Sequence, residues 1–420
     1  MKILHINTYS TSGACIAATR FHLQMLEIGI ESKMLFLHKM GYDVPQSFEY
    51  KKSEEIPNTF LNRQKLRFLK LLFPNKKTIR QQNEIKLLNR IKGFEMFSFA
   101  TTEVDITTQS IYKEADIIHF HWTGTFLDFS FFQKNTKPVV WTLHDMNPFT
   151  GGCHYSNACE KYKTNCAECP QLVGTSNKNN AAIDLQYKIE KLRNKLVFVT
   201  SPSKWLLDCA SNSSIYRNMT GKQIFNCVDF SVFTPQDKTF CRQIFSMPAN
   251  KKILLFVSDS LENNRKGFDL LINALKQCKS QNIHLCAIGK KPQSFEFDID
   301  ISFLGKIKDE KLLSLVYSLA DVFIMPSRED NLPNVMIESL ACGVPVISFP
   351  IGGMLDVVKT GFNGILTKDV SSQSLASAID DFVSNKYSFN SDVIRTDAML
   401  NFSPLEQTKK YIEVYKSLLT

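Results

Sequence analysis

The run Ser327-Arg-Glu-Asp-Asn-Leu-Pro-Asn-Val-Met-Ile-Glu-Ser-Leu-Ala-Cys-Gly-Val-Pro-Val-Ile-Ser348 decides how this chain of 420 residues is interpreted. Polar turn formers lead into an apolar segment that predicts a helix over 335–342. Gly343 is the C-cap, and the apolar residues after it predict a buried strand. The run therefore places Asp330 just before a helix and Glu338 inside it, eight positions apart.

Two carboxylates at this spacing suit a ligand with many hydroxyls and a phosphate. Each carboxylate can accept hydrogen bonds from a pair of sugar hydroxyls, and backbone amides at the helix N-terminus can hold a phosphate between them. We expect Asp330 near the reacting end of the ligand and Glu338 deeper, where a ribose would reach it. The alternative is a capped helix with Glu338 on its surface.

The run resembles the donor-site signature of family 4 retaining glycosyltransferases with the GT-B fold. Its Asp-Asn-Leu-Pro-Asn form is associated with the branch that builds capsule, exopolysaccharide and O-antigen chains. The resemblance implies that Asn331, Leu332 and Pro333 bind the donor together with the two acids. This chain has Asp330 where the family usually has Glu. The shorter side chain keeps the charge, and we expect the donor hexose to sit slightly differently against it.

Length and composition are those of an ordinary two-domain protein, with 420 residues of which 44% are hydrophobic. No window approaches the roughly 18 apolar residues of a membrane span, and residues 1–7 enter a strand without the features of a signal peptide. Seven of the 11 cysteines are scattered, several of them in apolar runs, as in a reducing compartment. We therefore expect a cytoplasmic protein.

Strands and helices alternate along both halves of the chain, which predicts an α/β protein with two Rossmann-like, doubly wound domains. Strands are expected at 2–7, 32–38, 116–121, 138–144, 196–200, 252–257, 284–289, 301–305 and 321–325, and helices at 14–26, 267–276 and 311–319. No Gly-x-Gly-x-x-Gly is present, which weighs against a dinucleotide oxidoreductase.

We predict an acceptor-side domain at 1–205 and a nucleotide-sugar-binding domain at 206–403. The residues around Asn226-Cys-Val-Asp229 resemble the linker of the same family. The resemblance also implies that the last helix, at 404–420, packs back on the first domain. Two facing domains of this kind place the ligand in a central cleft, at the carboxyl ends of the strands.

Arg265 and Lys266 supply two cations just before a predicted helix. A helix N-terminus disfavours cations, so the diphosphate of a leaving nucleotide explains them better than solvation alone. They resemble the family's Arg-Lys-Gly element, which implies that Lys266 binds the phosphate. Many members carry another Arg shortly before this element, where this chain has Asp259 and Ser260. We assign that second role to Arg265.

The opposite face of the cleft offers His144 and the loop that contains Gly13 and Ala14. The loop can bring backbone close to a phosphate and an acceptor. His144 resembles the family's strand-end histidine that faces the donor sugar and acceptor, and a neutral imidazole can hydrogen-bond either one. The alternative is a structural histidine bonded to backbone. His119 and His121, on one face of their strand, are weaker candidates.

The resemblance implies a retaining transfer in which the leaving phosphate oxygen helps to deprotonate the incoming hydroxyl. Catalysis then depends on positioning and charge stabilisation, for which we select His144, Lys266 and Asp330. No catalytic metal is expected. The predicted reaction moves a hexose from a UDP- or GDP-sugar to a glycan or lipid-linked acceptor in bacterial surface polysaccharide synthesis. A GT-B nucleotide-sugar epimerase and a non-catalytic carbohydrate-binding scaffold are the alternatives.

Four more cysteines cluster at 151–170, namely Cys153, Cys159, Cys166 and Cys169. Four thiolates within 17 residues can form a closed tetrahedral zinc site that fixes a loop without a core of its own. The pair Cys166-x-x-Cys169 is its strongest part. Disulfides and free thiols are the alternatives, and a reducing compartment disfavours disulfides.

Basic residues concentrate at 51–95, where 12 Lys or Arg against four Glu give +8 of the net charge of +9. The excess is local, so the sequence does not predict nucleic-acid binding. Within 61–91, cations flank an apolar run at 68–73, a pattern typical of a helix on the inner membrane surface, where lipid-linked acceptors lie. A helical insertion with solvated cations is the alternative.

Overall fold

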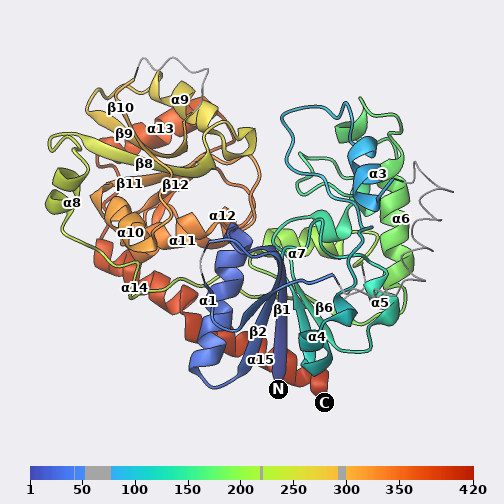
Figure 1. The fold of residues 1–420 in the computed structure, drawn as a ribbon. Helices are drawn as coiled ribbons and strands as arrows, with labels where there is room; N and C mark the ends of the chain where they lie inside the picture. Colours follow the sequence, from blue (N-terminus) through green and yellow to red (C-terminus); the bar gives the residue numbers. More distant parts are fainter. Residues whose placement is uncertain (42, 53–76, 218–220, 292–298) are drawn as a thin grey trace.

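The computed structural model describes residues 1–41, 43–52, 77–217, 221–291 and 299–420. They form two α/β domains, each built around one sheet (Figure 1). All the strand pairs of both sheets are parallel. The two doubly wound domains that the alternation of strands and helices predicts are therefore confirmed.

The first sheet has seven strands in the order β3-β2-β1-β4-β5-β6-β7. Their bounds are β1 Lys2–Tyr9, β2 Glu31–His38, β3 Ser47–Glu49, β4 Ile117–Phe120, β5 Val139–Thr142, β6 Val197–Ser201 and β7 Gly221–Gln223. Every residue of β4 and β5 is buried, because crossover helices cover both faces of a parallel sheet. This burial explains why these strands are mostly apolar.

The second sheet has six strands in the order β10-β9-β8-β11-β12-β13. Their bounds are β8 Lys252–Ser260, β9 Ile283–Lys290, β10 Ile301–Gly305, β11 Val322–Met325, β12 Val346–Ser348 and β13 Gly364–Leu366. The first four coincide with predicted strands. The sequence does not reveal β13, because it has only three residues.

Helices cover both sheets, and α9 and α11 fall where the sequence predicts them. The helices up to the end of the first sheet are α1 Gly13–Glu27, α3 Ile79–Lys86, α4 Ser110–Glu114, α5 Phe131–Lys134, α6 Asn180–Leu192 and α7 Lys204–Ser211. The later helices are α8 Lys238–Ile244, α9 Phe268–Leu275, α10 Glu310–Leu319, α11 Asn334–Ala341, α12 Met354–Val357, α13 Ser372–Val383, α14 Ser391–Phe402 and α15 Pro404–Leu419.

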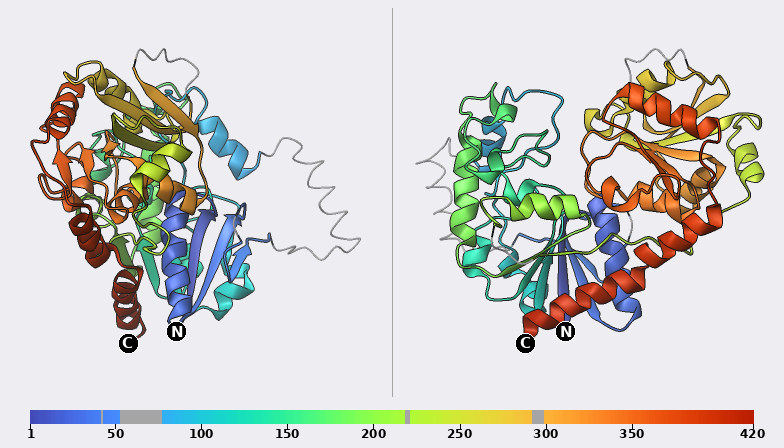
Figure 2. Two further views of the ribbon diagram at one scale, coloured as in Figure 1. Left: turned by 90° about the vertical axis from the view of Figure 1, so that its left-hand side faces the viewer. Right: turned by 180° about the vertical axis from the view of Figure 1, so that it is seen from behind.

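The last helix, α15, leaves the second domain and runs along the first, as predicted (Figure 2). Tyr411 and Tyr415 are fully buried in one core cluster with Phe21 and Ile117 of the first domain. The Tyr411 Oη lies 2.8 Å from the Thr142 Oγ1 at the end of β5. Apolar packing and buried hydrogen bonds therefore attach this helix to the first domain.

The first sheet continues past residue 205, where we expected the first domain to end. α7 packs on β6, and β7 pairs with β6 through Gly221 and Val199. Residues 206–217 and 221–223 therefore lie on or in the first sheet. The sequence gives little sign of this strand, since β7 has three residues and none of them is buried.

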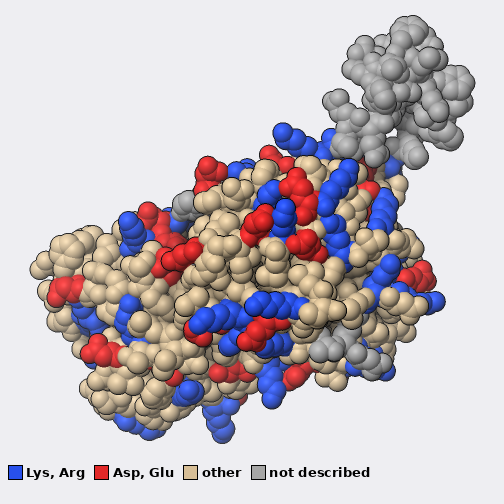
Figure 3. All heavy atoms as spheres, turned by 90° about the horizontal axis from the view of Figure 1, so that it is seen from below, with Lys and Arg blue, Asp and Glu red and all other residues tan. Residues whose placement is uncertain are grey.

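The basic segment at 51–95 is described only outside 53–76. Its apolar run at 68–73 lies outside the described residues, so a membrane-surface helix there stays a prediction. Within the described part of the chain, none of the helices combines the length and apolar character of a membrane span. The face that carries both chain ends intersperses basic and acidic side chains (Figure 3).

Candidate functional site

Both sheets reverse their strand order at one point, and folds of this kind bind ligands there, beyond the carboxyl ends of the strands. The reversal lies between β1 and β4 in the first sheet and between β8 and β11 in the second. The chain after these strands carries Gly13, Arg265, Lys266 and Asp330, and His144 follows the neighbouring β5. The topology thus brings the predicted site residues to two facing edges.

Asp330 is buried and pairs with both predicted cations. Its Oδ2 accepts a hydrogen bond from Lys266 Nζ at 2.6 Å, and its Oδ1 lies 3.1 Å from Arg265 Nη1. The Ser327 hydroxyl donates to Oδ2 at 3.2 Å. Three of the four charged residues selected for the donor side therefore form one cluster.

The protonation states of this cluster follow from its charges. Burial alone would raise the pKa of Asp330, but Lys266 and Arg265 outweigh burial and lower that pKa to about 2. Burial lowers the pKa of Lys266, and the Asp330 carboxylate opposes this shift. Asp330 is therefore an anion at any physiological pH and lies between two cations.

Two glycines let the backbone close around Asp330. Gly267 has a φ of +69°, and a Cβ there would lie 1.9 Å from the carbonyl oxygen of Pro326. Gly352 has a φ of +52°, and a Cβ there would lie 1.8 Å from the Asp330 carbonyl oxygen. A side chain at either position would force the backbone to move. These glycines fix the loop after β11 against the start of α9 and the loop after β12.

The first domain reaches Arg265 through two residues that the sequence does not single out. Glu95 Oε1 accepts hydrogen bonds from Arg265 Nε at 2.6 Å and from Asn263 Nδ2 at 2.9 Å. The Arg265 guanidinium also lies over the Tyr155 ring, 4.1 Å from its centroid. Arg265 is thus held between carboxylates of both domains. No motif marks Glu95, and Tyr155 lies unmarked among the clustered cysteines.

Glu338 is as buried as Asp330, and its carboxylate is hydrogen-bonded to protein groups. It accepts hydrogen bonds from Arg20 Nη2 at 2.8 Å and from Tyr317 Oη at 3.0 Å. With 4% of its surface exposed, it is not the surface glutamate of the alternative interpretation. Arg20 belongs to α1, so this buried ion pair joins the two domains. Ribose binding by Glu338 stays a prediction.

The residues that follow Asp330 join the domains along the edge of the cleft. Asn331 Nδ2 donates to the carbonyl oxygens of Leu143 at 3.1 Å and His144 at 3.3 Å. Leu332 is buried in the core of the second domain, and Pro333 occupies the N-cap position of α11. These contacts shape the donor side, while direct contact of the three residues with a donor stays a prediction.

His144 is half-buried and ends a chain of histidines in the first domain. Its Nε2 lies 3.2 Å from His121 Nδ1, and His121 Nε2 lies 2.9 Å from His5 Nδ1. Burial lowers the pKa of His144 to about 4, against the opposing effect of Asp145. The imidazole is therefore neutral near pH 7, as its predicted hydrogen-bonding role requires. The ring partner recorded among the described residues is the His121 side chain.

His119, a weaker candidate, uses both ring nitrogens inside the protein. Its Nδ1 lies 2.6 Å from Tyr415 Oη of α15, and its Nε2 lies 2.7 Å from Thr142 Oγ1. The ring is fully buried. His119 therefore packs beneath the cleft, whereas His121 on the same strand face contacts His144.

Gly13 and Ala14 begin α1 at the cleft edge of the first domain. The Ser12 side chain caps this helix by accepting from the backbone N–H of Cys15 at 3.2 Å. A Cβ at Gly13 would meet no atom within 4 Å, and its carbonyl oxygen accepts from Asn334 Nδ2 at 2.9 Å. The helix start thus faces the second domain beside open space, and its contact with phosphate or acceptor stays a prediction.

A cavity of ≈ 760 Å³ opens between the domains beside the charged cluster. Its walls include Trp205 and residues 156–160 of the first domain, and Glu329 and residues 350–352 of the second. Glu329 accepts from the backbone N–H of Asn157 at 2.9 Å across this junction. An indole among polar groups suits a sugar, which has apolar faces and a polar rim.

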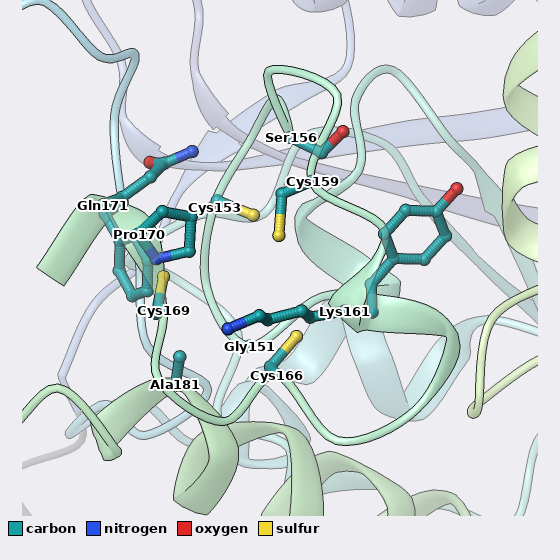
Figure 4. A pocket seen from close by; sticks show the side chains of 12 residues that line it. Gly151, Cys153, Ser156, Cys159, Lys161, Cys166, Cys169, Pro170, Gln171 and Ala181 are labelled. Atoms are coloured by element: carbon teal, nitrogen blue, oxygen red, sulfur yellow. The ribbon is translucent and has the colours of Figure 1, made fainter.

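The four clustered cysteines lie around one small cavity (Figure 4). Lys161 and Tyr162 also line this space, whose volume is ≈ 20 Å³. All four cysteines are free thiols in this structure. Their loop also forms part of the wall of the larger cavity, through residues 156–163.

The second domain matches a known enzyme family. Residues 251–385 fit the family model described as glycosyl transferases group 1. The putative colanic acid biosynthesis glycosyl transferase WcaC of Escherichia coli K12 is 26% identical over 247 residues, which cover 55% of this chain and 58% of that protein. The chain spans about half the length of the curated relatives it matches. The resemblance inferred from the sequence run is confirmed.

Solved structures match over nearly the entire chain. Anabaena Alr3699/HepE in complex with UDP has a TM-score of 0.67 at 16% identity, covering 99% of this chain and 100% of that one. Sucrose-phosphate synthase from Thermosynechococcus elongatus also has a TM-score of 0.67, at 17% identity, covering 100% and 99%. At this identity the likeness concerns the fold alone, and it confirms the GT-B architecture.

Proposed function

We propose that this chain, whose second domain is that of a group 1 glycosyl transferase, moves a sugar from a nucleotide-sugar to a glycan or lipid-linked glycan acceptor. The cluster of Asp330, Lys266 and Arg265 at the switch point of the second sheet is the observation that carries this proposal. The relative named for colanic acid biosynthesis favours a surface polysaccharide as the product.

In the proposed donor complex, Lys266 and Arg265 neutralise the diphosphate while the bond to the sugar breaks. Both cations already lie beside the Asp330 carboxylate, so charge stabilisation needs little reorganisation. Asp330 accepts hydrogen bonds from hydroxyls of the transferred hexose. A UDP-sugar is the first donor to test, because the HepE structure contains UDP, and a GDP-sugar is the second.

We further propose that transfer retains the anomeric configuration. Asp330 makes a poor nucleophile, because two cations share its charge and lower its pKa to about 2. The leaving phosphate oxygen instead takes the proton of the incoming hydroxyl on the same face of the sugar. The neutral His144 donates or accepts a hydrogen bond at the sugar, and carries no charge that would oppose departure of the diphosphate.

The acceptor is proposed to enter the cavity between the domains. Its ≈ 760 Å³ can hold more than one sugar ring, and it opens beside Asp330 through Glu329 and Gly352. Trp205 offers an apolar face on which a ring can stack. These features support a saccharide acceptor, free or attached to a lipid.

A nucleotide-release assay tests the activity. The purified chain would receive UDP-glucose, UDP-galactose or GDP-mannose together with a lipid-linked oligosaccharide extract, and released UDP or GDP would be measured. We expect one donor to be consumed and Asp330→Asn to reduce the rate at least about 100-fold. NMR of the new linkage would report its anomeric configuration, and inversion would contradict the proposed retention.

The same assay separates the alternatives. An epimerase would isomerise the nucleotide-sugar in the absence of acceptor and would release no sugar to another molecule. A carbohydrate-binding scaffold would consume none of the donors. Either result would overturn the proposed transfer.

A further inference from the structure

The loop at 151–170 has almost no regular structure, yet it holds a defined shape. It contains only the short 3-10 turns Lys161–Lys163 and Pro170–Leu172. Four of its non-glycine residues adopt positive φ angles, at Asn157, Ala158, Cys166 and Glu168. Such conformations are unfavourable and persist only where the surroundings fix them. Something beyond helix and strand hydrogen bonds must therefore stabilise this loop.

The four cysteines of the loop can add to the side-chain hydrogen bonds and core packing that hold it. All of them line one cavity of ≈ 20 Å³, and Figure 4 shows their side chains around the same space. That volume fits a single ion and excludes an organic ligand. Cys166 and Cys169 come from one tight turn, while Cys153 and Cys159 come from the preceding segment, so two parts of the loop converge on one point.

We infer that Cys153, Cys159, Cys166 and Cys169 bind one structural zinc ion. Four sulfur ligands in a tetrahedral arrangement are a closed site, with no open position for catalysis. Binding exchanges the four thiol protons for Zn²⁺ and leaves a net charge of −2 on the site. The zinc would join the two parts of a loop whose Tyr162, Cys166 and Cys169 already pack on the core of the first domain.

Positive groups around the cavity are placed to compensate that charge. Burial lowers the pKa of Arg90, and the charges of Cys153 and Cys169 oppose this shift. The Arg90 Nε is buried without a hydrogen-bond partner. Lys161 lines the cavity, and its Nζ donates to the carbonyls of Ala167 and Glu168 at 3.0 Å each. A buried unpartnered donor is costly beside neutral thiols and is favourable beside a tetrathiolate.

The thiols must still move to reach zinc. Tetrahedral zinc holds its sulfur atoms about 3.8 Å apart, given a bond of about 2.3 Å. Among the described residues, the one trio of possible ligands that already lies within 4.8 Å is His5, His119 and His121. That trio is less suitable, because both ring nitrogens of His119 are hydrogen-bonded to protein hydroxyls. The four cysteines already line one shared cavity, into which their thiols would have to turn.

The zinc site would support the cleft from a distance. The backbone N–H groups of Ser156 and Asn157, between Cys153 and Cys159, donate to Glu329 at 3.3 and 2.9 Å. Glu329 directly precedes Asp330. A metal that fixes this loop therefore fixes one wall of the interdomain cavity without touching the reacting groups.

Metal analysis of the full chain, purified under reducing conditions, tests the inference independently of any transferase activity. We expect elemental analysis by inductively coupled plasma mass spectrometry to find about one zinc ion per chain. Cobalt exchange should give the visible absorption of a tetrahedral cobalt thiolate. Cys166→Ser should lose the zinc, and Cys209→Ser should keep it. Cys209 is a matched control because it is a half-buried free thiol of α7 outside the ring of four.

Three results would overturn the inference. Wild-type protein with no zinc and four alkylatable thiols in the loop would show free cysteines. Disulfide-linked peptides spanning the cluster would show oxidised pairs, and stoichiometric iron would show another metal. If Cys166→Ser does not fold, the cobalt spectrum and thiol alkylation of the wild type still decide between these outcomes.

Discussion

The two walls of the cleft hold their polar groups by opposite means. On the second domain, Asp330, Lys266 and Arg265 are charged and paired at 2.6 to 3.1 Å. On the first domain, His121 and His144 are hydrogen-bonded and neutral, because burial lowers their pKa values. Charge is thus concentrated where a diphosphate would leave, and the histidines of the facing wall are kept neutral. Substitutions in one wall should therefore have different effects on activity and stability from substitutions in the other.

Removing a cation from the charged wall should have the largest effect. We expect Lys266→Ala to lower kcat/KM by about 10³-fold, about 4 kcal/mol, because it removes a group that stabilises the leaving diphosphate. Steady-state kinetics with the consumed donor would measure this. Lys368→Ala, an exposed lysine of the same domain, should leave kcat/KM unchanged. Equal loss in both variants would contradict a specific role for Lys266.

Filling the space at Gly267 should disturb the same wall through its backbone. We expect Gly267→Ala to lower the free energy of unfolding by about 3 kcal/mol, since a positive φ and the Pro326 carbonyl at 1.9 Å both oppose a Cβ. Gly305 has the same φ of +69° with no atom within 4 Å, so Gly305→Ala should cost only about 1 kcal/mol. Urea unfolding of both variants would test the difference, and equal losses would exclude the contact as a cause.

Acid should weaken the neutral wall before the charged one. Burial lowers the pKa values of His5, His119 and His121 well below 6.5. The unfolded chain therefore binds more protons below pH 6.5, and the folded state loses stability as pH falls. At pH 5 the loss is about 2 kcal/mol for each histidine. The Asp330 carboxylate, with its pKa of about 2, loses its contribution only below about pH 4.

Urea unfolding at pH 7, 6 and 5 would measure this loss. His121→Gln removes one of the titrating groups and should show a smaller decrease between pH 7 and 5. A free energy of unfolding that stays constant over this range would show that these histidines are not held neutral by burial.

Releasing Arg265 from the first domain should have the smallest effect. Glu95 competes with a diphosphate for Arg265, so we expect Glu95→Gln to tighten nucleoside diphosphate binding about threefold, less than 1 kcal/mol. Glu103→Gln changes an exposed acid of the same domain and should have no effect. Weaker binding after Glu95→Gln would show that Glu95 positions Arg265 rather than competing for it.

The charged wall could be predicted well because its signal is local. Asp330 and the helix after it form one continuous run, and Lys266 lies in a short recognisable element. The alternation of apolar strands and helices likewise predicts the fold, since a parallel sheet buries its strands on both faces. Very short strands such as β7 and β13 carry too few residues for a pattern.

Contacts between the domains could not be predicted, because they join residues far apart in the sequence. Arg20 lies 318 positions from Glu338, and Glu95 lies 170 positions from Arg265. Arg20 and Glu95 do not belong to a motif. The sequence therefore does not indicate that the Glu338 carboxylate pairs with an arginine. For Glu338, the sequence run predicts ribose binding, whereas the folded structure pairs the same carboxylate with Arg20.

Calorimetric titration with UDP and GDP tests the central claim, that the charged wall binds a nucleoside diphosphate. We predict that one of them binds the wild type, that Lys266→Ala weakens binding at least about tenfold, and that His144→Ala changes it less than about twofold. Absence of binding by both nucleotides would contradict the claim. So would equal weakening by Lys266→Ala and His144→Ala, because the two walls would then not differ in function.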